Sequence, residues 1–258
     1  MLEALFPGYS ANLGPSIAVR SLTLFSHFSA RPGLAALART IDHALLSPTL
    51  REAELETGCA LAHREGVASV CVRPCAVSRA RHLLAGSTVE VGTVIGFPQG
   101  GHHSAIKLAE SAQALADGAT ELDMVINLGW ALDAQYSRVV DEVEPILRLT
   151  RSQGAILKVI LETAKLPEDI KIKLCQHIGS LAVDFVKTST GYGDGGATLE
   201  DVRLLRLYSP ASVQVKASGG IRTLDQALAF LEAGATRLGT GSTEALMISA
   251  RQSQTNPG

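Results

Sequence analysis

The strongest constraint on the fold is a regular alternation of two kinds of segment after residue 40. Short apolar segments rich in β-branched residues are separated by stretches of helical period, such as 104–117, 134–152 and 223–233. Eight such strand–helix units predict an α/β fold, the (β/α)8 TIM barrel, as a single domain. The predicted strands are residues 40–46, 68–72, 89–97, 120–126, 156–161, 183–189, 213–218 and 236–241.

An open, doubly wound sheet is the alternative fold for this alternation. It would carry a glycine-rich phosphate turn after its first strand, and none follows residues 40–46. Several predicted helices end at Gly-Ala, as at Gly118 and Gly234, which is typical of a glycine C-cap before the next strand. The sequence therefore favours the closed barrel.

Alternation along the predicted strands sorts their side chains into two faces. In strands four to seven, Asp123, Lys158, Lys187 and Lys216 fall on the face opposite the aliphatic residues. Because helices cover the outside of a barrel, we expect the aliphatic set to face outward and the charged set inward. Chemistry in this fold occurs at the carboxyl ends of the strands, so these four side chains predict an active site.

Two of these lysines point to a particular chemistry. Lys187 (VDFVKTSTGYG) and Lys216 (VQVKASGG) each interrupt a segment that reads as a buried strand. Burial disfavours the charged form of lysine, and we expect two neighbouring lysines to lower each other's pKa further. A neutral lysine amine attacks carbonyl groups and forms a Schiff base. The sequence therefore predicts covalent carbonyl chemistry.

Other polar residues of the predicted strands allow a structural interpretation as well. Lys158 could be the ion-pair partner of Asp123 or Glu162, and Asp123 a simple counter-ion. Asp42 could be a turn residue, and Cys71 a small buried hydrophobic residue without a chemical role.

Glycine-rich turns follow the last predicted strands. Residues 218–222 (SGGIR) and 239–243 (GTGST) stand where TIM barrels commonly bind phosphate, because glycines let backbone amides approach the anion. Ser242 could cap the next helix or donate to the phosphate. A third turn, residues 190–196, is predicted to close over the substrate.

Eight segments of the chain resemble the deoxyribose-phosphate aldolase family. They are IDHALLSP, VASVCVRP, GTVIGFPQG, ELDMVINLG, LKVILET, FVKTSTGYG, VKASGGIRT and RLGTGS, and the resemblance spans roughly residues 40 to 248. It implies a class I aldolase that reversibly cleaves 2-deoxy-D-ribose 5-phosphate to D-glyceraldehyde 3-phosphate and acetaldehyde. It also implies that no metal or organic cofactor takes part.

The resemblance carries roles to individual residues. It implies that Lys187 forms the Schiff base, that Lys216 lowers the pKa of Lys187, and that Asp123 takes part in a proton relay. Lys158 would assist that relay and order a catalytic water. The residues expected to bind substrate are Asp42, Cys71, Thr190, Gly219, Gly220, Gly239 and Ser242.

Two positions depart from the family pattern. Some members carry a phosphate-contacting lysine where this chain has Tyr192, and relatives often carry serine where it has Gly241. We expect phosphate to depend more on backbone amides here and plain sugars to be better tolerated.

Two further functions remain open at this stage. Another Schiff-base barrel, such as a transaldolase-like or bisphosphate aldolase, would share the lysine of the sixth strand. A phosphosugar-binding or sensor protein without catalysis could also use this barrel, but intact Lys187, Lys216 and Asp123 argue for chemistry.

Composition narrows the partners. A formal net charge of -2, scattered arginines and 4% aromatic residues argue against nucleic acid, and no apolar run reaches the roughly 18 residues that span a membrane. The spacing of the four cysteines fits no common metal site, and no signal peptide is visible, so we expect reduced thiols and a cytoplasmic location. A homo-oligomer, dimer or tetramer, is expected.

The first 39 residues differ in composition from the rest. They contain one acidic residue, Glu3, together with several serines and three arginines, as in some transit peptides. The alternative is an extension that packs on the domain as a short helix or stays mobile. The predicted division is an extension at 1–39, a barrel at 40–250 and a tail at 251–258.

Overall fold

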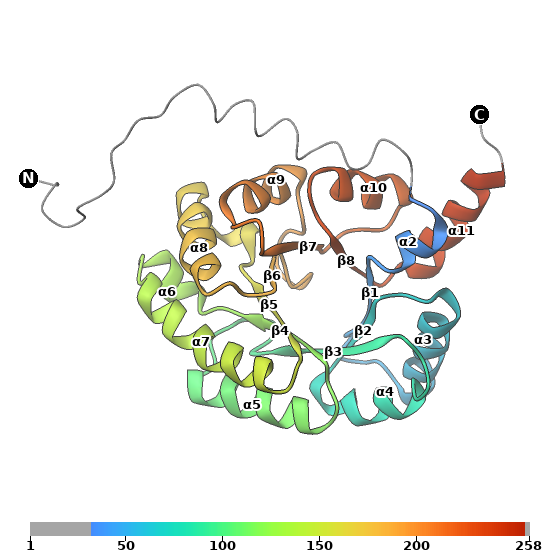
Figure 1. Ribbon diagram of the computed structural model, residues 1–258, viewed down its shortest axis with the longest axis horizontal. Coiled ribbons are helices and arrows are strands. Elements are labelled where there is room, and N and C mark those ends of the chain that lie inside the picture. The colour runs from blue at the N-terminus through green and yellow to red at the C-terminus, as the bar shows by residue number, and fades with distance from the viewer. Residues whose placement is uncertain (1–31, 256–258) are drawn as a thin grey trace, which may run out of the picture. The chain divides into compact units, whose positions relative to one another are not determined.

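A computed structural model describes residues 32–255, which contain a closed barrel of eight parallel strands surrounded by helices (Figure 1). The predicted fold is confirmed. The strands are β1 (Ile41–Leu45), β2 (Ser69–Val72), β3 (Glu90–Ile95), β4 (Glu121–Val125), β5 (Ile156–Ile160), β6 (Phe185–Lys187), β7 (Gln214–Ser218) and β8 (Arg237–Thr240). Each lies within a predicted strand segment and is one to four residues shorter, as expected where strand ends pass into turns.

The helices lie on the outside of the strands (Figure 1). They are α2 (Leu34–Ala38), α3 (Glu52–Glu65), α4 (Val77–Leu83), α5 (Ser104–Ala116), α6 (Leu128–Leu132), α7 (Tyr136–Ser152), α8 (Glu168–Ser180), α9 (Leu199–Tyr208), α10 (Leu224–Glu232) and α11 (Thr243–Thr255). Two short 3-10 helices, η1 (Pro74–Ala76) and η2 (Thr163–Lys165), follow β2 and β5.

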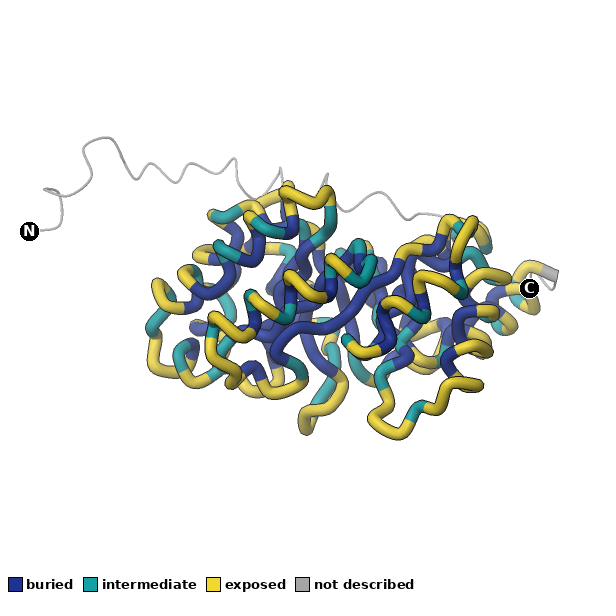
Figure 2. Tube along the Cα trace, turned by 90° about the horizontal axis from the view of Figure 1, so that it is seen from below, coloured by how far each residue is buried: buried dark blue, intermediate teal, exposed yellow. Residues whose placement is uncertain are grey.

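The core is formed by outward-facing aliphatic residues of the strands and by buried residues of the helices. Figure 2 shows buried residues concentrated in the middle of the domain, with exposed residues around them. Helix α7 illustrates how the core forms, because Val139, Val143 and Ile146 recur at helical spacing and are completely buried. Its neighbour β5 turns Leu157 and Val159 toward the helices, and both are completely buried as well. Each such aliphatic side chain contributes about 1.5–3 kcal/mol when it leaves water.

The charged inward side chains lie in three layers, which the strand register defines, below a further layer of Ala44, Val94, Ile160 and Ser218. Pairs such as Asp123 with Lys158 and Lys216 with Arg237 show that a register partner on the next strand belongs to the next layer down. Alternate strands therefore fill each layer, as is usual in this fold. Of these three, the upper layer is Cys71, Asp123, Lys187 and Gly239; the middle layer is Asp42, Gly92, Lys158 and Lys216; the lower layer is Ser69, Glu121, Phe185 and Arg237.

These layers are polar, whereas bulky branched aliphatic residues usually dominate a barrel interior. The four charged residues that the alternation pattern placed inward, Asp123, Lys158, Lys187 and Lys216, are all there and at most 3% exposed. That prediction is confirmed. Charged groups so deeply buried need partners or a chemical role, so the interior is where function is to be sought.

Two helices show where the described domain begins and ends. Helix α2 lies within the predicted extension, and its Leu37 and Ala38 are buried in the core. Helix α11 continues to Thr255, past the expected start of the tail at 251. The possible targeting segment was predicted within residues 1–39, of which residues 1–31 lie outside the described residues. Within the described range, no helix combines the length and apolar character needed to cross a membrane.

Candidate active site

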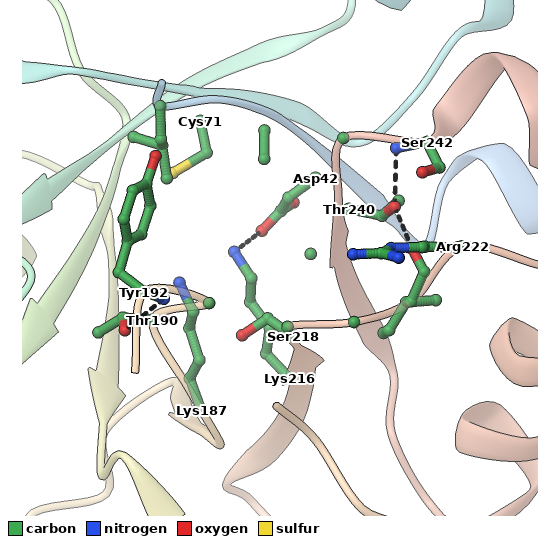
Figure 3. A pocket seen from close by; sticks show the side chains of 18 of the residues that line it. Asp42, Cys71, Lys187, Thr190, Tyr192, Lys216, Ser218, Arg222, Thr240 and Ser242 are labelled. Atoms are coloured by element: carbon green, nitrogen blue, oxygen red, sulfur yellow. Dashed lines mark hydrogen bonds and ion pairs between the residues drawn. The ribbon is translucent and has the colours of Figure 1, made fainter. Parts of the chain in front are cut away.

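A cavity of about 270 Å³ opens at the carboxyl ends of the strands (Figure 3). Its walls come from β1, β2, β6, β7, β8 and the turns that follow them. Nine of the residues predicted from the sequence line it: Asp42, Cys71, Lys187, Thr190, Lys216, Gly219, Gly220, Gly239 and Ser242. The other two predicted residues, Asp123 and Lys158, do not line the cavity. Lys158 donates a hydrogen bond to Asp123, and Asp123 also accepts from Lys187 and Lys216.

Lys187 projects from β6 into the cavity beside Lys216 (Figure 3). Its Nζ donates to Oδ2 of Asp123 at 2.6 Å, and the residue is 3% exposed. Burial lowers the pKa of Lys187; Asp123 opposes this shift, and the positive charge of Lys216 adds to it. The structure thus provides a lysine that loses its proton more readily than a free one.

The sequence predicted that the two lysines would lower each other's pKa, but the pKa of Lys216 shifts in the opposite direction. Burial disfavours its charge, but Asp123 and Asp42 outweigh burial and raise the pKa of Lys216 above its usual range. Its Nζ donates to Oδ2 of Asp123 at 2.7 Å and to Oδ2 of Asp42. Of the two lysines, only Lys187 therefore has a lowered pKa, because Lys216 has two carboxylate partners and Lys187 has one.

Lys158 occupies the centre of the ion pairs. Its Nζ lies 2.8 Å from Oδ1 of Asp123, 2.5 Å from Oε2 of Glu121 and 3.4 Å from Oδ2 of Asp42. Burial is again opposed by these carboxylates, and the pKa of Lys158 is raised well above its usual range. Lys158 therefore stays charged and is no candidate for a neutral amine.

Glu162, the other partner considered for Lys158, turns away from it. The residue follows β5 in the left-handed backbone region, with φ of 55°, and its Oε2 accepts from the backbone N–H of Thr190 at 3.0 Å. It therefore anchors the turn that lines the cavity. The alternation pattern missed this because the strand ends before Glu162.

Both aspartates are ionised. Burial opposes their charge, but the surrounding cations hold the pKa of Asp123 and of Asp42 well below the usual range. Asp42 lies on β1 and is completely buried, so it is no turn residue. It accepts from Ser69 Oγ at 2.7 Å and from Arg237 at 2.5 Å.

The charges of this network indicate which of its bases loses a proton most readily. The carboxylates are Asp42, Asp123 and Glu121, and the basic side chains are Lys158, Lys187, Lys216 and Arg237. Three negative charges balance three of the four bases. The pKa is raised for Lys158, Lys216 and Arg237 and lowered for Lys187 alone among them. Lys187 is therefore the base of this network that loses its proton most readily.

Cys71 contributes shape rather than charge. Burial, and then the charge of Asp123, raise the pKa of its thiol to about 11, so the thiolate nucleophile is scarce at neutral pH. The side chain lines the cavity wall as a small, uncharged group.

Glycines of the turns after β7 and β8 form one wall of the cavity, called the glycine wall below. Gly219 and Gly220 have φ of +89° and +80°, a region that other residues rarely adopt. A Cβ on Gly239 would lie 2.8 Å from Cβ of Ser218 and 3.2 Å from Cε of Lys216, so this glycine leaves room for the lysine. Ser242 stands immediately before α11, and its backbone N–H donates to Thr240 Oγ1 at 2.9 Å.

Sequence reasoning missed a cation at this wall. Arg222 lines the cavity on the same side as Thr240 and Ser242 (Figure 3). The signal was available, because Arg222 comes two residues after the Gly-Gly pair of the turn. Tyr192 lines the other side and packs edge-on against Phe97, with ring centroids 5.4 Å apart.

Known proteins resemble this chain over nearly the whole barrel. The sequence profile described as "DeoC/LacD family aldolase" matches residues 36–246. Among curated proteins, a deoxyribose-phosphate aldolase of Rhodopirellula baltica is 46% identical over 84% of this chain and 90% of its own length. One from Thermococcus gammatolerans is 44% identical over 84% of this chain and 98% of its own length.

A solved structure gives the same result for the fold. The tetrameric deoxyribose phosphate aldolase from Aeropyrum pernix superposes with a TM-score of 0.79 at 34% identity, covering 85% of this chain and 92% of that one.

Proposed function

The chain belongs to the DeoC/LacD aldolase family, and from this we propose that it reversibly cleaves 2-deoxy-D-ribose 5-phosphate to D-glyceraldehyde 3-phosphate and acetaldehyde. The observation that carries the proposal is the buried amine of Lys187, which lines the cavity and loses its proton more readily than the other bases of the network. The reaction would proceed through a Schiff base on this residue.

The first step joins enzyme and sugar. Neutral Lys187 Nζ adds to the C1 aldehyde of the open-chain sugar, and the carbinolamine loses water to give a protonated imine. Lys216 stays positive beside it and can donate a proton to the departing hydroxyl. Asp123 holds both amines through one oxygen, at 2.6 and 2.7 Å, which keeps Lys187 in place for attack.

The second step breaks the C2–C3 bond of the sugar. The C3 hydroxyl loses its proton, the C2–C3 bond electrons move toward the imine, and glyceraldehyde 3-phosphate leaves with C3 as its new carbonyl. The enamine that remains takes a proton at C2, and water then hydrolyses the imine to acetaldehyde and neutral Lys187. Addition of the enamine to an aldehyde reverses the cleavage.

Asp123 and Lys158 would handle protons in this sequence. The low pKa of Asp123 makes it a weak final acceptor, so it would pass protons between the lysines and a water molecule rather than keep them. Lys158 Nζ, 2.8 Å from Oδ1 of Asp123, keeps that carboxylate charged and oriented, and would help to order the water.

The phosphate would lie against the glycine wall. Backbone amides of the turns at Gly219–Gly220 and Gly239–Ser242 line the cavity, as in the usual phosphate site of this fold. Arg222 would supply a positive charge there, which partly replaces the lysine that relatives carry at the position of Tyr192.

Trapping with acetaldehyde tests the proposal. The protein is mixed with acetaldehyde and borohydride, and the reduced adduct is located by peptide mass analysis. We expect a single adduct on Lys187, its loss in Lys187→Ala, and acetaldehyde release from the phosphorylated sugar by the unmodified enzyme. An adduct on another lysine, or cleavage by well-folded Lys187→Ala, would overturn the mechanism. Transfer of a dihydroxyacetone unit without acetaldehyde release would instead indicate a transaldolase.

The assembly and location are also proposals. The Aeropyrum pernix relative is described as tetrameric, which supports a homo-oligomer for this chain, a dimer or a tetramer. Light scattering on the purified full chain tests this, and a monomer at assay concentration would contradict it. A cytoplasmic location stays a prediction from the reduced cysteines.

A further inference from the structure

The lower layer of the barrel contains an ion pair that the proposed mechanism does not use. Arg237 Nη1 lies 3.1 and 3.0 Å from Oε1 and Oε2 of Glu121 and 2.5 Å from Oδ1 of Asp42. Its guanidinium carbon also lies 5.3 Å from the ring centroid of Phe185. The arginine is thus held by side chains from β1, β4 and β6.

This pair lies away from the substrate. Arg237 precedes Gly239 by two residues on the same face of β8, and Glu121 precedes Asp123 by two on β4. Gly239 lines the cavity, whereas neither Arg237 nor Glu121 does. Neither can therefore touch a reacting atom, and any effect on catalysis must pass through the layers above.

The contacts connect Arg237 and Glu121 to the three buried lysines of the network, Lys158, Lys187 and Lys216. Glu121 Oε2 accepts from Lys158 Nζ at 2.5 Å, and Lys158 contacts Asp123, the partner of Lys187. Arg237 shares Asp42 with Lys216. Arg237 is thus linked to Lys216 through one shared carboxylate, Asp42, and Glu121 is linked to Lys187 through Lys158 and then Asp123.

We propose that Arg237 and Glu121 are positioning residues of opposite effect, a counter-charge pair that sets the proton occupancy of Lys187 from beneath the active site. The inference rests on the proposed Schiff-base function of Lys187. With all other partners charged, the network is neutral when Lys187 has no proton. Removing the arginine leaves a negative excess that favours protonated Lys187, and removing the glutamate leaves a positive excess that favours the neutral amine.

The other charged and titratable groups around the two sites are accounted for. Burial counts against the charge of Arg237, but Asp42 and Glu121 raise its pKa, so it remains charged throughout the working range. The groups that face Lys187 or Arg237 are Asp42 on β1, the neutral Cys71 on β2, Glu121 and Asp123 on β4, Lys158 on β5 and Lys216 on β7. Of these groups only Glu121 is changed in the test, and the other change is Arg237 itself.

The test compares kcat/KM against pH for cleavage of 2-deoxy-D-ribose 5-phosphate. The acidic limb of this profile reports the pKa of the essential base in the free enzyme. Arg237→Met keeps the length and apolar stem of the side chain without its charge, and we expect it to move the limb to higher pH by roughly 1 unit. Glu121→Gln should move it to lower pH by a similar amount. Arg237→Lys, which keeps the charge, should stay close to the unmodified enzyme.

Structural damage alone would lower kcat/KM without moving the two limbs in opposite directions. The double variant Arg237→Met/Glu121→Gln restores the charge balance, and its limb should return to within about 0.3 unit of the unmodified enzyme if the two effects cancel. The proposal would be overturned if the acidic limb of the kcat/KM profile stayed in place in the single variants, or moved in the same direction in both. Absence of cleavage by the unmodified enzyme would instead refute the proposed function itself.

Discussion

Lys187 and Lys216 are register partners on neighbouring strands, β6 and β7, yet they belong to successive layers of the barrel interior. The offset lets both Nζ atoms reach a single oxygen of Asp123 from different heights. It also brings Asp42 of the middle layer within reach of Lys216. The pKa values of two lysines of similar burial are thereby shifted in opposite directions.

Replacing Lys216 tests this difference. Lys216→Leu removes a positive charge that lowers the pKa of Lys187, so the pKa of Lys187 should rise and more of the amine be protonated at neutral pH. Since only the neutral amine attacks, the acidic limb of kcat/KM should move to higher pH by about 1 unit or more, a loss of at least about tenfold below the limb. Initial rates across the pH range measure this.

Lys216→Arg is the matched control, because it keeps the positive charge beside Lys187. Its acidic limb should stay near that of the unmodified enzyme even if the larger head group lowers the rate. If the leucine variant kept both the rate and the limb of the unmodified enzyme, Lys216 would have no part in tuning Lys187.

Much of this site follows from the alternation of side chains along four strands. The aliphatic residues of β4 to β7 had to face the helices, which left Asp123, Lys158, Lys187 and Lys216 for the interior. Short strands with a strict two-residue period fix that choice, because a slip by one residue would turn the charged side chains toward the apolar helices. The inward position of these residues was therefore predictable.

The pairing of those charges was not predictable. Layers depend on the stagger between strands, which the sequence of a single strand does not contain. Glu121 fell on the inward face without an evident partner, and Arg237, at the start of β8, gave no local sign that it reaches β1 and β4. The pKa of Lys216 is raised by its contacts with Asp123 and Asp42, which the sequence did not reveal, so the direction of this shift was predicted wrongly.

Arg222 offers a test of phosphate recognition. Arg222→Leu removes the cation from the glycine wall, and charge-assisted hydrogen bonds contribute about 1.5–3 kcal/mol. We expect kcat/KM for the phosphorylated sugar to fall about 10- to 100-fold, with little change for plain 2-deoxyribose. Arg222→Lys keeps the charge and should retain most of the preference. Equal losses on both sugars would show that Arg222 acts on the fold or the chemistry instead of on phosphate.

A second buried ion pair, outside the cavity, should matter for stability. Lys107 Nζ of α5 lies 2.9 Å from Oε1 of Glu142 on α7 and donates to the carbonyl of Val125 at 2.8 Å; both charged side chains are completely buried. Lys107→Met leaves the carboxylate without its cation, which should lower the free energy of unfolding by about 3–5 kcal/mol. Urea unfolding followed by circular dichroism measures the loss.

The double variant Lys107→Met/Glu142→Gln serves as the control for this pair. Glutamine removes the uncompensated charge and keeps an acceptor for the backbone N–H of Asn127, which donates to Glu142 at 3.1 Å. We expect the double variant to be more stable than Lys107→Met alone. A double variant at least as unstable as the single one would mean that packing around Lys107, and not its charge, stabilises the contact of α5 with α7.

Gly241 is the position where a serine of the family pattern is missing, and the structure has room for one. A Cβ there would meet the carbonyl oxygen of Ala44 at 3.7 Å, an ordinary contact, so serine fits without strain. Gly241→Ser would add a hydroxyl to the cavity wall beside the expected phosphate, where one hydrogen bond contributes about 0.5–1.5 kcal/mol. The ratio of kcat/KM for phosphorylated over plain 2-deoxyribose should therefore rise about 2- to 10-fold. Gly241→Ala fills the same space without a hydroxyl and should leave the ratio unchanged; an equal rise in both variants, or none in the serine variant, would refute the role of the missing hydroxyl.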